Sequence, residues 1–233
     1  MMKLRHGKYL SLIACTSLCA LGNAQFFDDF DRPDNANLGA NWTNQSTSVG
    51  IANNFAVNTG GGLALATVNG FNVSHMSGVL SVDAIAGQTT GYVALVLGYA
   101  GTGLNQALFG KVQDNDGDGD FDSFGLYTGN NVTTGGTFAS LTTEFLRGRI
   151  YAYMSDADTF TLDVDNNFDT IIDESHSRTG ISAFSGSLGT GVGLGMWDSA
   201  MANNYNAVPE PATFAALGLG ALALMRRRKT KKA

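Results

Sequence analysis

Short strand-like runs fill the chain between residues 26 and 207, and no long stretch there repeats apolar residues at helical spacing. The run 79–85 alternates apolar and polar residues, as a half-buried strand does. The run 92–99 is almost entirely apolar, which predicts a central strand. Further strands are predicted at 149–154, 159–164, 170–172 and 191–197, with a hairpin turn at 155–158. We therefore predict an all-β chain that forms one antiparallel β-sandwich or jelly roll.

The cysteines limit the chemistry of this domain. Both of them, Cys15 and Cys19, lie close to the amino terminus, and the body that follows has none. The body can therefore have no disulfide, no thiolate metal site and no cysteine nucleophile. About 184 residues, from 25 to 208, are long enough to bury a core without such crosslinks.

The body is strongly acidic. Between residues 25 and 208 it has five lysine and arginine residues against nineteen aspartate and glutamate residues, a formal net charge of −14. Such a surface repels nucleic acids and anionic lipids and attracts divalent cations. A nucleic-acid partner is therefore excluded.

The amino terminus has the pattern of a signal peptide at residues 1–24. A basic start is followed by the mostly apolar run 9–21 and by the small residues Gly22, Asn23 and Ala24. This order predicts cleavage by signal peptidase after Ala24 and export of the body. An alternative stays open, because residues 12–15 have the form of a lipoprotein box in which Cys15 would be lipidated.

The carboxyl terminus combines three elements. Val208, Pro209, Glu210 and Pro211 predict an extended, accessible linker, because neither a helix interior nor a central strand accepts such prolines. The fourteen uncharged residues 212–225 would span about 21 Å as a helix, less than the ~30 Å hydrocarbon core. The tail 226–233 has six cations, which start with Arg226, Arg227 and Arg228, and these are expected to stay on the cytoplasmic side.

This arrangement resembles the PEP-CTERM sorting signal of exported bacterial proteins. The resemblance implies a transient anchor in the inner membrane, cleavage near Pro-Glu-Pro by a membrane protease of the exosortase type, and delivery to the cell envelope, the outer surface or the exterior. An anchor that is never cut is the alternative. The chain then divides into a signal peptide (1–24), a β-sandwich domain (25–207) and a sorting signal (208–233) with a transmembrane helix at 212–225.

The body resembles a second family. The acidic and aromatic segment 28–34 leads into 38–42, which has the spacing Gly-x-x-Trp, and the chain closes with 192–197 followed by 204–206. These segments resemble the opening and closing strands of concanavalin A-like, laminin-G-like sandwiches. The resemblance implies that the opening and closing segments meet in space. Many unrelated functions share this fold, so it does not decide the function.

The clearest candidate site is an acidic loop. Aspartates alternate with other residues, and the loop glycines permit a tight curl; the candidate ligands are Asp114, Asp116, Asp118, Asp120 and Asp122. Calcium prefers six to eight oxygen ligands, so we predict a Ca²⁺ site. The loop resembles the first nine positions of an EF-hand, but Gly125 stands where the EF-hand glutamate would be. The site would therefore be completed by Asp122 or by a distant carboxylate. A solvated acidic hairpin tip is the alternative, and a second cluster at 163–169 is interpreted as a strand end and turn.

Residues suited to catalysis are sparse. The body has only two histidines, His75 and His176, and no Gly-x-Ser-x-Gly motif. Its two glutamates, Glu144 and Glu174, are thirty positions apart, and neither has an acidic neighbour at alternate spacing on an apolar strand. We therefore expect no enzyme.

Binding of carbohydrate is a further possibility. Trp42, Trp197 and Tyr205 would suit a platform on which sugars stack. Tryptophan in a sandwich strand more often belongs to the core, so we expect both tryptophans to be buried. The function predicted first is a structural or adhesive role in a surface matrix, with exopolysaccharide as a partner. A lectin-like carbohydrate-binding module is the first alternative, and a glycan hydrolase or lyase is the second.

Overall fold

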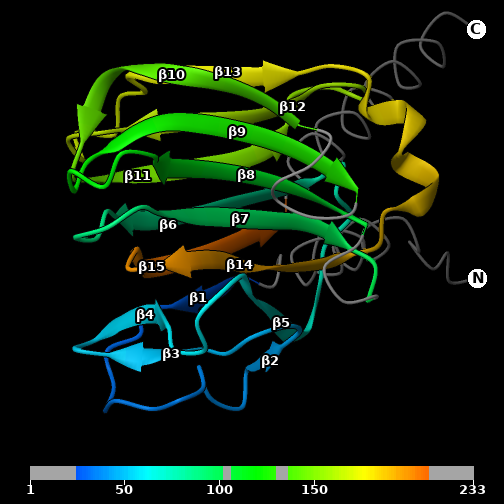
Figure 1. The fold of residues 1–233 in the computed structure, drawn as a ribbon. Helices are drawn as coiled ribbons and strands as arrows, with labels where there is room; N and C mark the ends of the chain where they lie inside the picture. Colours follow the sequence, from blue (N-terminus) through cyan, green and yellow to red (C-terminus); the bar gives the residue numbers. More distant parts are fainter. Residues whose placement is uncertain (1–24, 102–105, 130–135, 210–233) are drawn as a thin grey trace, which may run out of the picture. The chain divides into compact units, whose positions relative to one another are not determined.

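The computed structural model describes residues 25–101, 106–129 and 136–209 (Figure 1). The predicted signal peptide (1–24), the transmembrane helix (212–225) and the basic tail (226–233) lie outside the described residues. Within the described ranges, no helix is both long and apolar enough to cross a membrane.

Two antiparallel sheets pack face to face, which confirms the predicted β-sandwich. The eight-stranded sheet has the order β13 (Glu174–Arg178), β12 (Phe160–Asp165), β11 (Arg147–Met154), β6 (Gly78–Ile85), β15 (Met201–Pro209), β4 (Phe55–Asn58) and β3 (Val49–Ala52), with β1 (Phe26–Asp28) paired to β15. The seven-stranded sheet, in front in Figure 1, has the order β10 (Gly136–Phe145), β9 (Phe121–Gly129), β8 (Ala107–Asp114), β7 (Gly91–Tyr99), β14 (Gly191–Asp198), β5 (Ala64–Asn72) and β2 (Trp42–Asn44). Two short 3-10 helices, η1 (Ile181–Ala183) and η2 (Ser185–Ser187), join β13 to β14.

Most of the predicted strands are present. The runs 79–85, 92–99, 149–154, 159–164 and 191–197 correspond to β6, β7, β11, β12 and β14. The predicted turn 155–158 joins β11 to β12, which pair directly.

The prediction of a strand at 170–172 is wrong. Ile171 is 66% exposed and Ile172 is 42% exposed, and both lie in a turn. The carboxylate of Asp165 accepts a hydrogen bond from the backbone N–H of Thr170, and the carboxylate of Asp169 accepts one from the backbone N–H of Ile171. Because these N–H groups donate to side chains, they are not available for hydrogen bonds to a neighbouring strand. The strand is instead the following polar segment β13.

Apolar residues are buried on both faces of β7. Val93, Leu95 and Leu97 belong to the main core between the sheets. Tyr92 and Val96 belong to a second buried apolar cluster, formed by the side chains of the seven-stranded sheet that do not face the main core. This two-sided burial explains why the strand is a continuous apolar run in the sequence.

The opening and closing segments meet, as the resemblance implied. β1 pairs with β15 through Phe27↔Asn206 and Asp28↔Tyr205. The rings of Trp42 and Tyr205 pack edge to face with centroids 5.0 Å apart. The indole Nε1–H of Trp42 donates to Asp28 Oδ2 at 2.7 Å.

An ion pair between Arg32 and Asp28 lies next to Trp42. The guanidinium of Arg32 forms two hydrogen bonds with the Asp28 carboxylate, and it also donates to the backbone carbonyl of Leu38. The hydrogen bond with Asp28 raises the pKa of Arg32 above its ordinary value. Asp28 therefore has a partner for each of its oxygens, as a buried carboxylate requires.

The two tryptophans differ in environment. Trp42 lies in the core and is 6% exposed, whereas Trp197 is 38% exposed, so the expectation that Trp197 is buried is wrong. Val192, Leu194 and Met196 of β14 face the main core. The alternation of side chains along a strand therefore points Trp197 away from the core.

Replacement of each tryptophan by alanine should separate these environments. Trp42→Ala should lower the free energy of unfolding by about 3–5 kcal/mol, because it removes a core ring and one of the two hydrogen bonds that Asp28 Oδ2 accepts. Trp197→Ala should lower it by less than about 1 kcal/mol. Urea unfolding followed by circular dichroism measures both, and equal losses would contradict the assignment.

Candidate functional site

Three loops meet at one end of the sandwich, on the left in Figure 1. They are the acidic loop between β8 and β9, the loop 86–90 between β6 and β7, and the turn between β14 and β15. A Cβ on Gly117 would lie 3.2 Å from the backbone nitrogen of Thr90, so the acidic loop packs directly on the loop 86–90. Thr89 in turn donates its backbone N–H to the hydroxyl of Ser199 at 3.2 Å, and Thr89 Oγ1 lies 2.8 Å from Ser199 Oγ. The acidic loop and Trp197 therefore belong to one end of the molecule.

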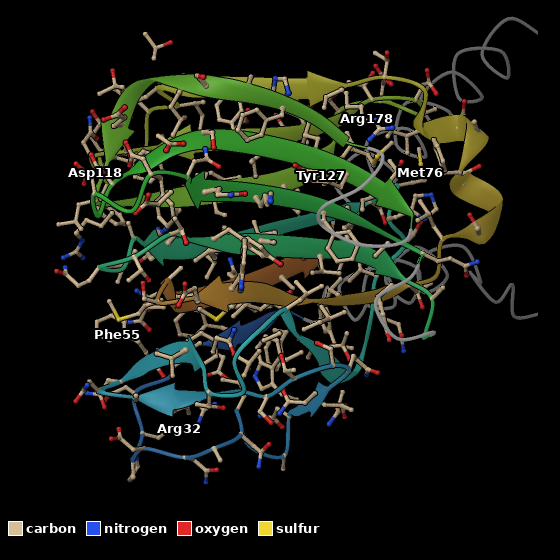
Figure 2. The ribbon with its side chains drawn as sticks, in the orientation of Figure 1. Arg32, Phe55, Met76, Asp118, Tyr127 and Arg178 are labelled. Carbon is tan, nitrogen blue, oxygen red and sulfur yellow. The ribbon has the colours of Figure 1, made fainter. Side chains whose placement is uncertain are left out.

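Asp114 organises the acidic loop. Its side chain is fully buried, and its carboxylate accepts the backbone N–H groups of Gly117 at 2.6 Å and Gly119 at 3.1 Å. Both glycines have positive φ, +79° and +99°, which only glycine adopts without strain. Asp118 lies at the tip of this loop, far from Tyr127 on the sheet (Figure 2).

Three of the predicted ligands come together. Asp114, Asp116 and Asp122 each place a carboxylate oxygen within 4.8 Å of the others. The backbone N–H and the side-chain amide of Asn115 hold the carboxylate of Asp122 at 2.8 and 2.5 Å. The same group does not include Asp118 or Asp120, which lie between Asp116 and Asp122 in the loop. The geometry suits a hard cation that takes oxygen ligands.

A distant carboxylate lies near this group. Partial desolvation raises the pKa of Glu144, and so do the negative charges of the loop aspartates, among which Asp118 and Asp116 act most strongly. Glu144 belongs to β10, far from the loop in sequence. This residue is the kind of remote carboxylate that the sequence alone did not identify, because strand pairing brings it to the loop.

The turn after β12 has the same hydrogen-bond frame as the acidic loop. Asn166 donates its backbone N–H to Asp173 at 2.9 Å, as Asn115 does to Asp122 at 2.8 Å. Thr170 donates to Asp165, as Gly119 does to Asp114. Positive φ values follow the same order, at Phe168 and Thr170. At the positions of Asp116 and Asp120 in the acidic loop, this turn has Asn167 and Ile171. The two turns therefore have similar backbone shapes, but the turn after β12 carries less negative charge.

A second feature surrounds Trp197. Its ring lies beside that of Tyr92, its partner in the ladder, with centroids 5.9 Å apart. Next to Tyr92 the ammonium of Lys111 lies 4.5 Å from the Tyr92 ring centroid and 4.9 Å from that of Tyr127. Lys111 is 3% exposed and donates to Gln113 Oε1 at 2.5 Å.

The ammonium of Lys111 and the hydroxyl of Tyr92 make fewer hydrogen bonds among the described residues than they could. Burial lowers the pKa of Lys111 to about 8, and its ammonium has one hydrogen-bond acceptor among the described residues where three can be used. The hydroxyl of Tyr92 is buried and has no hydrogen-bond partner in the described part of the chain. Burial also raises the pKa of Tyr92. Buried polar groups of this kind call for an additional acceptor, supplied by water or a ligand.

The predicted three-residue platform does not form. Trp42 and Tyr205 pack together inside the core, while Trp197 points away from it. The neighbours that accompany Trp197 instead are Tyr92, Lys111 and Tyr127. Strand geometry places Tyr92 and Val93 on opposite faces, but the uniformly apolar run 92–99 gave no signal of which face points away from the main core.

A small open pocket lies at the other end of the seven-stranded sheet. It has a volume of about 340 Å³, and Thr67, Asn72, Tyr99 and Thr190 contribute to its lining. The hydroxyl of Tyr99 donates to Gln45 Oε1 at 3.1 Å, so the wall of the pocket is partly polar.

Two of the residues considered for catalysis, Glu174 and His176, have structural contacts. The carboxylate of Glu174 accepts the backbone N–H groups of Thr142 and Thr143, where β10 leaves its regular register. His176 stacks on Phe124 with centroids 4.9 Å apart, and burial lowers the pKa of His176. Neither arrangement resembles an acid–base pair.

The start of the predicted sorting linker lies in a strand. β15 continues to Pro209 and pairs with β6 through Val208↔Val79 and Pro209↔Gly78. The prediction of a free linker is therefore wrong for Val208 and Pro209, because the ladder extends to the end of the described chain. Ala24, Glu210, Pro211 and Arg226 to Arg228 lie outside the described residues.

Comparison with known proteins identifies the end of the chain. A family model described as the PEP-CTERM protein-sorting motif matches residues 207–229. This motif indicates an exported protein that is anchored transiently in the membrane. No curated protein matches the chain.

Solved structures share the fold at low sequence identity. The exoplasmic/lumenal domain of VIP36, in a Ca²⁺/Man2-bound form, is 10% identical, with a TM-score of 0.53 over 80% of this chain and 88% of that one. The CBM2 module of the evolved Dit of Lactobacillus casei BL23 phage J-1 is 14% identical, with a TM-score of 0.52 over 80% and 97%. Apo Crh5 transglycosylase is 13% identical, with a TM-score of 0.51 over 80% and 84%. The body is thus a concanavalin A-like, lectin-like sandwich, and the fold alone does not separate binding from catalysis.

The pH dependence of stability should report the burial of Lys111. Its pKa in the folded chain is about 8, below the ordinary 10.5, so between these values the unfolded chain holds more protons and the free energy of unfolding rises with pH. Each unit of pKa difference contributes about 1.4 kcal/mol. Above about pH 10 the tyrosines, whose pKa values burial raises, act in the opposite direction. Urea unfolding from pH 7.5 to 9.5 should therefore show a gain in wild type that Lys111→Met lacks, and parallel curves would contradict it.

Proposed function

We propose that the exported sandwich binds a polysaccharide of the cell envelope or extracellular matrix and has a structural or adhesive role there. The observation that carries this proposal is the exposed ring of Trp197 beside the buried Tyr92–Lys111 pair. Aromatic rings offer a flat surface to the apolar faces of sugars. Tyr92 and Lys111 are buried next to that ring, so the exposed indole itself is the surface that a sugar would contact.

Related folds support the choice of ligand. The VIP36 domain was solved with Man2 and the phage protein is a CBM2 module, so this architecture accepts carbohydrate in other proteins. The body of this chain has a rigid sheet under Trp197, with Tyr92 paired to it across the ladder. A rigid support of this kind lowers the entropic cost of binding.

A glycan hydrolase or lyase is the second candidate, favoured by the Crh5 transglycosylase fold. Retaining glycosidases need two carboxyl groups about 5–5.5 Å apart. Here Glu174 holds the backbone of β10, and Glu144 lies beside the acidic loop. These placements favour binding over cleavage.

Calorimetric titration tests the platform, with exopolysaccharide from the producing culture, alginate and dextran as probes. Trp197→Ala should weaken binding of whichever probe wild type binds by at least tenfold, a loss of about 1.4 kcal/mol. Phe27→Ala is the matched control, because Phe27 is also an exposed aromatic residue, on β1 of the other sheet. Unchanged affinity in Trp197→Ala would contradict the platform, and release of reducing ends would favour the enzyme.

The two ends of the chain fit export and processing. Signal peptidase would cut after Ala24, and an exosortase-type protease would cut near Pro209, Glu210 and Pro211. The apolar run 212–225 and the basic tail would hold the precursor in the inner membrane until that cut. The mature sandwich would then reach the cell envelope, the outer surface or the exterior. Lipidation at Cys15 is the alternative for the amino terminus.

The acidic loop is proposed to bind Ca²⁺. The ligands would be Asp114, Asp116 and Asp122, with Asp118, Asp120 and Glu144 adding negative charge around them. Carboxylates this close repel one another unless a cation neutralises them. The loop packs on 86–90 and through it on Ser199, so the cation would stabilise the end of the molecule that holds Trp197.

Calcium should raise the thermal midpoint of the wild-type protein relative to chelator. At a hundredfold excess over the dissociation constant the gain is about 2.7 kcal/mol, and the constant should lie near 10⁻⁴–10⁻³ M, roughly the range of extracellular modules. Asp116→Asn with Asp118→Asn should respond much less, because asparagine keeps the turn's hydrogen-bond acceptors but removes two charges.

Asp31→Asn with Asp198→Asn is the control for net charge. Both side chains are exposed, and neither accepts a hydrogen bond within the described ranges. This control should respond to calcium as wild type does. An equal rise in the loop variant would place the metal elsewhere, for example in the turn 165–173.

A further inference from the structure

The last strand of the sandwich and the sorting motif share residues. β15 ends at Pro209, whereas the motif match begins at position 207. Residues 207–209 therefore belong both to the folded sheet and to the signal that a protease has to read.

These shared residues are held firmly. Ala207 is fully buried and pairs with Leu80 on one side and with Phe26 on the other. Val208 pairs with Val79 and Pro209 with Gly78, and both Val208 and Pro209 are half-buried. The end of β15 is thus part of the sheet.

Little chain separates the sheet from the apolar run. Only Glu210 and Pro211 stand between Pro209 and the run 212–225. Two extended residues reach about 7 Å. A protein that binds an extended peptide usually does so through the peptide's backbone N–H and C=O groups, and pairing with β6 already uses one edge of residues 207–209.

We infer that cleavage of the sorting signal requires residues 207–209 to leave β6, so that the folded sandwich acts as a brake on its own processing. The inference rests on the proposed exosortase-type cut near Pro-Glu-Pro. Chains are then cut while the end of β15 is unpaired, either before folding is complete or when the strand end frays. The strand re-forms in the mature protein if the cut lies after Pro209.

A disulfide across this ladder tests the brake. Val79→Cys with Val208→Cys places two cysteines at directly paired, half-buried positions, and the body has no cysteine of its own. Cα atoms of such antiparallel pairs lie about 4.5–5.5 Å apart, which suits a disulfide. Ile85→Cys with Met201→Cys is the matched control, because it joins the same two strands at their other end, also at half-buried positions.

The measurement is pulse–chase of the full chain in the producing strain, with the precursor and the cut form separated by mass. The Val79–Val208 disulfide should slow the cut at least tenfold, whereas the Ile85–Met201 disulfide and the single variant Val208→Cys should be cut at the wild-type rate. Added reductant should restore the rate. A spacer Gly-Ser-Gly-Ser inserted between Val208 and Pro209 should speed the cut, since it moves Pro-Glu-Pro away from the sheet.

Two results would overturn the inference. One is cutting of the Val79–Val208 disulfide form at the wild-type rate, and the other is an equal slowing by both disulfides. A wild-type chain that is never cut would instead overturn the proposed sorting cleavage itself. Resistance of each oxidised variant to protease before the chase shows that it is folded.

Discussion

Two-sided burial of β7 is the constraint on which the rest of the molecule depends. Its inward residues, such as Leu95, build the core between the sheets, and its outward residues, such as Tyr92, build the second cluster. Two rings of that second cluster, those of Tyr92 and Tyr127, contact the ammonium of Lys111, and the ring of Trp197 lies beside Tyr92. Lys111 is buried among rings and has no carboxylate partner among the described residues, which is unusual in a body of net charge −14. The proposed polysaccharide face is therefore a consequence of how the central strands pack.

The acidic loop adds charge to a shape that the backbone can hold by itself. The turn 165–173 shows this, since it forms the same hydrogen bonds with Asn167 and Ile171 in place of two aspartates. The loop's additional carboxylates are thus not needed for its shape. They are the reason to propose a cation there, and its packing on 86–90 connects that cation to Trp197.

Much of the fold could be predicted from the sequence, because alternation and apolar runs report burial directly. The strands around 79–85 and 92–99 follow from such patterns. The pairing of the opening and closing strands of the body was implied only by the resemblance to concanavalin A-like sandwiches. The exposed Ile171 could not be predicted, because carboxylates several residues away hold its turn. The position of Glu144 beside the loop depends on strand pairing, which local sequence does not report. Pro209 looked like a linker residue because proline is rare in ladders, but β1 ends opposite Ala207, so β15 has an open edge at Pro209 within the described residues, and proline is tolerated at sheet edges.

The most direct test of the polysaccharide face uses the two indole N–H signals in the nitrogen-15 NMR spectrum. Trp42 donates its N–H to Asp28 inside the core, and Trp197 lies on the proposed face. Addition of oligosaccharide fragments of the exopolysaccharide from the producing culture should shift the Trp197 signal and leave that of Trp42 in place. Binding that leaves the Trp197 signal unchanged, or that moves only the Trp42 signal, would contradict the account.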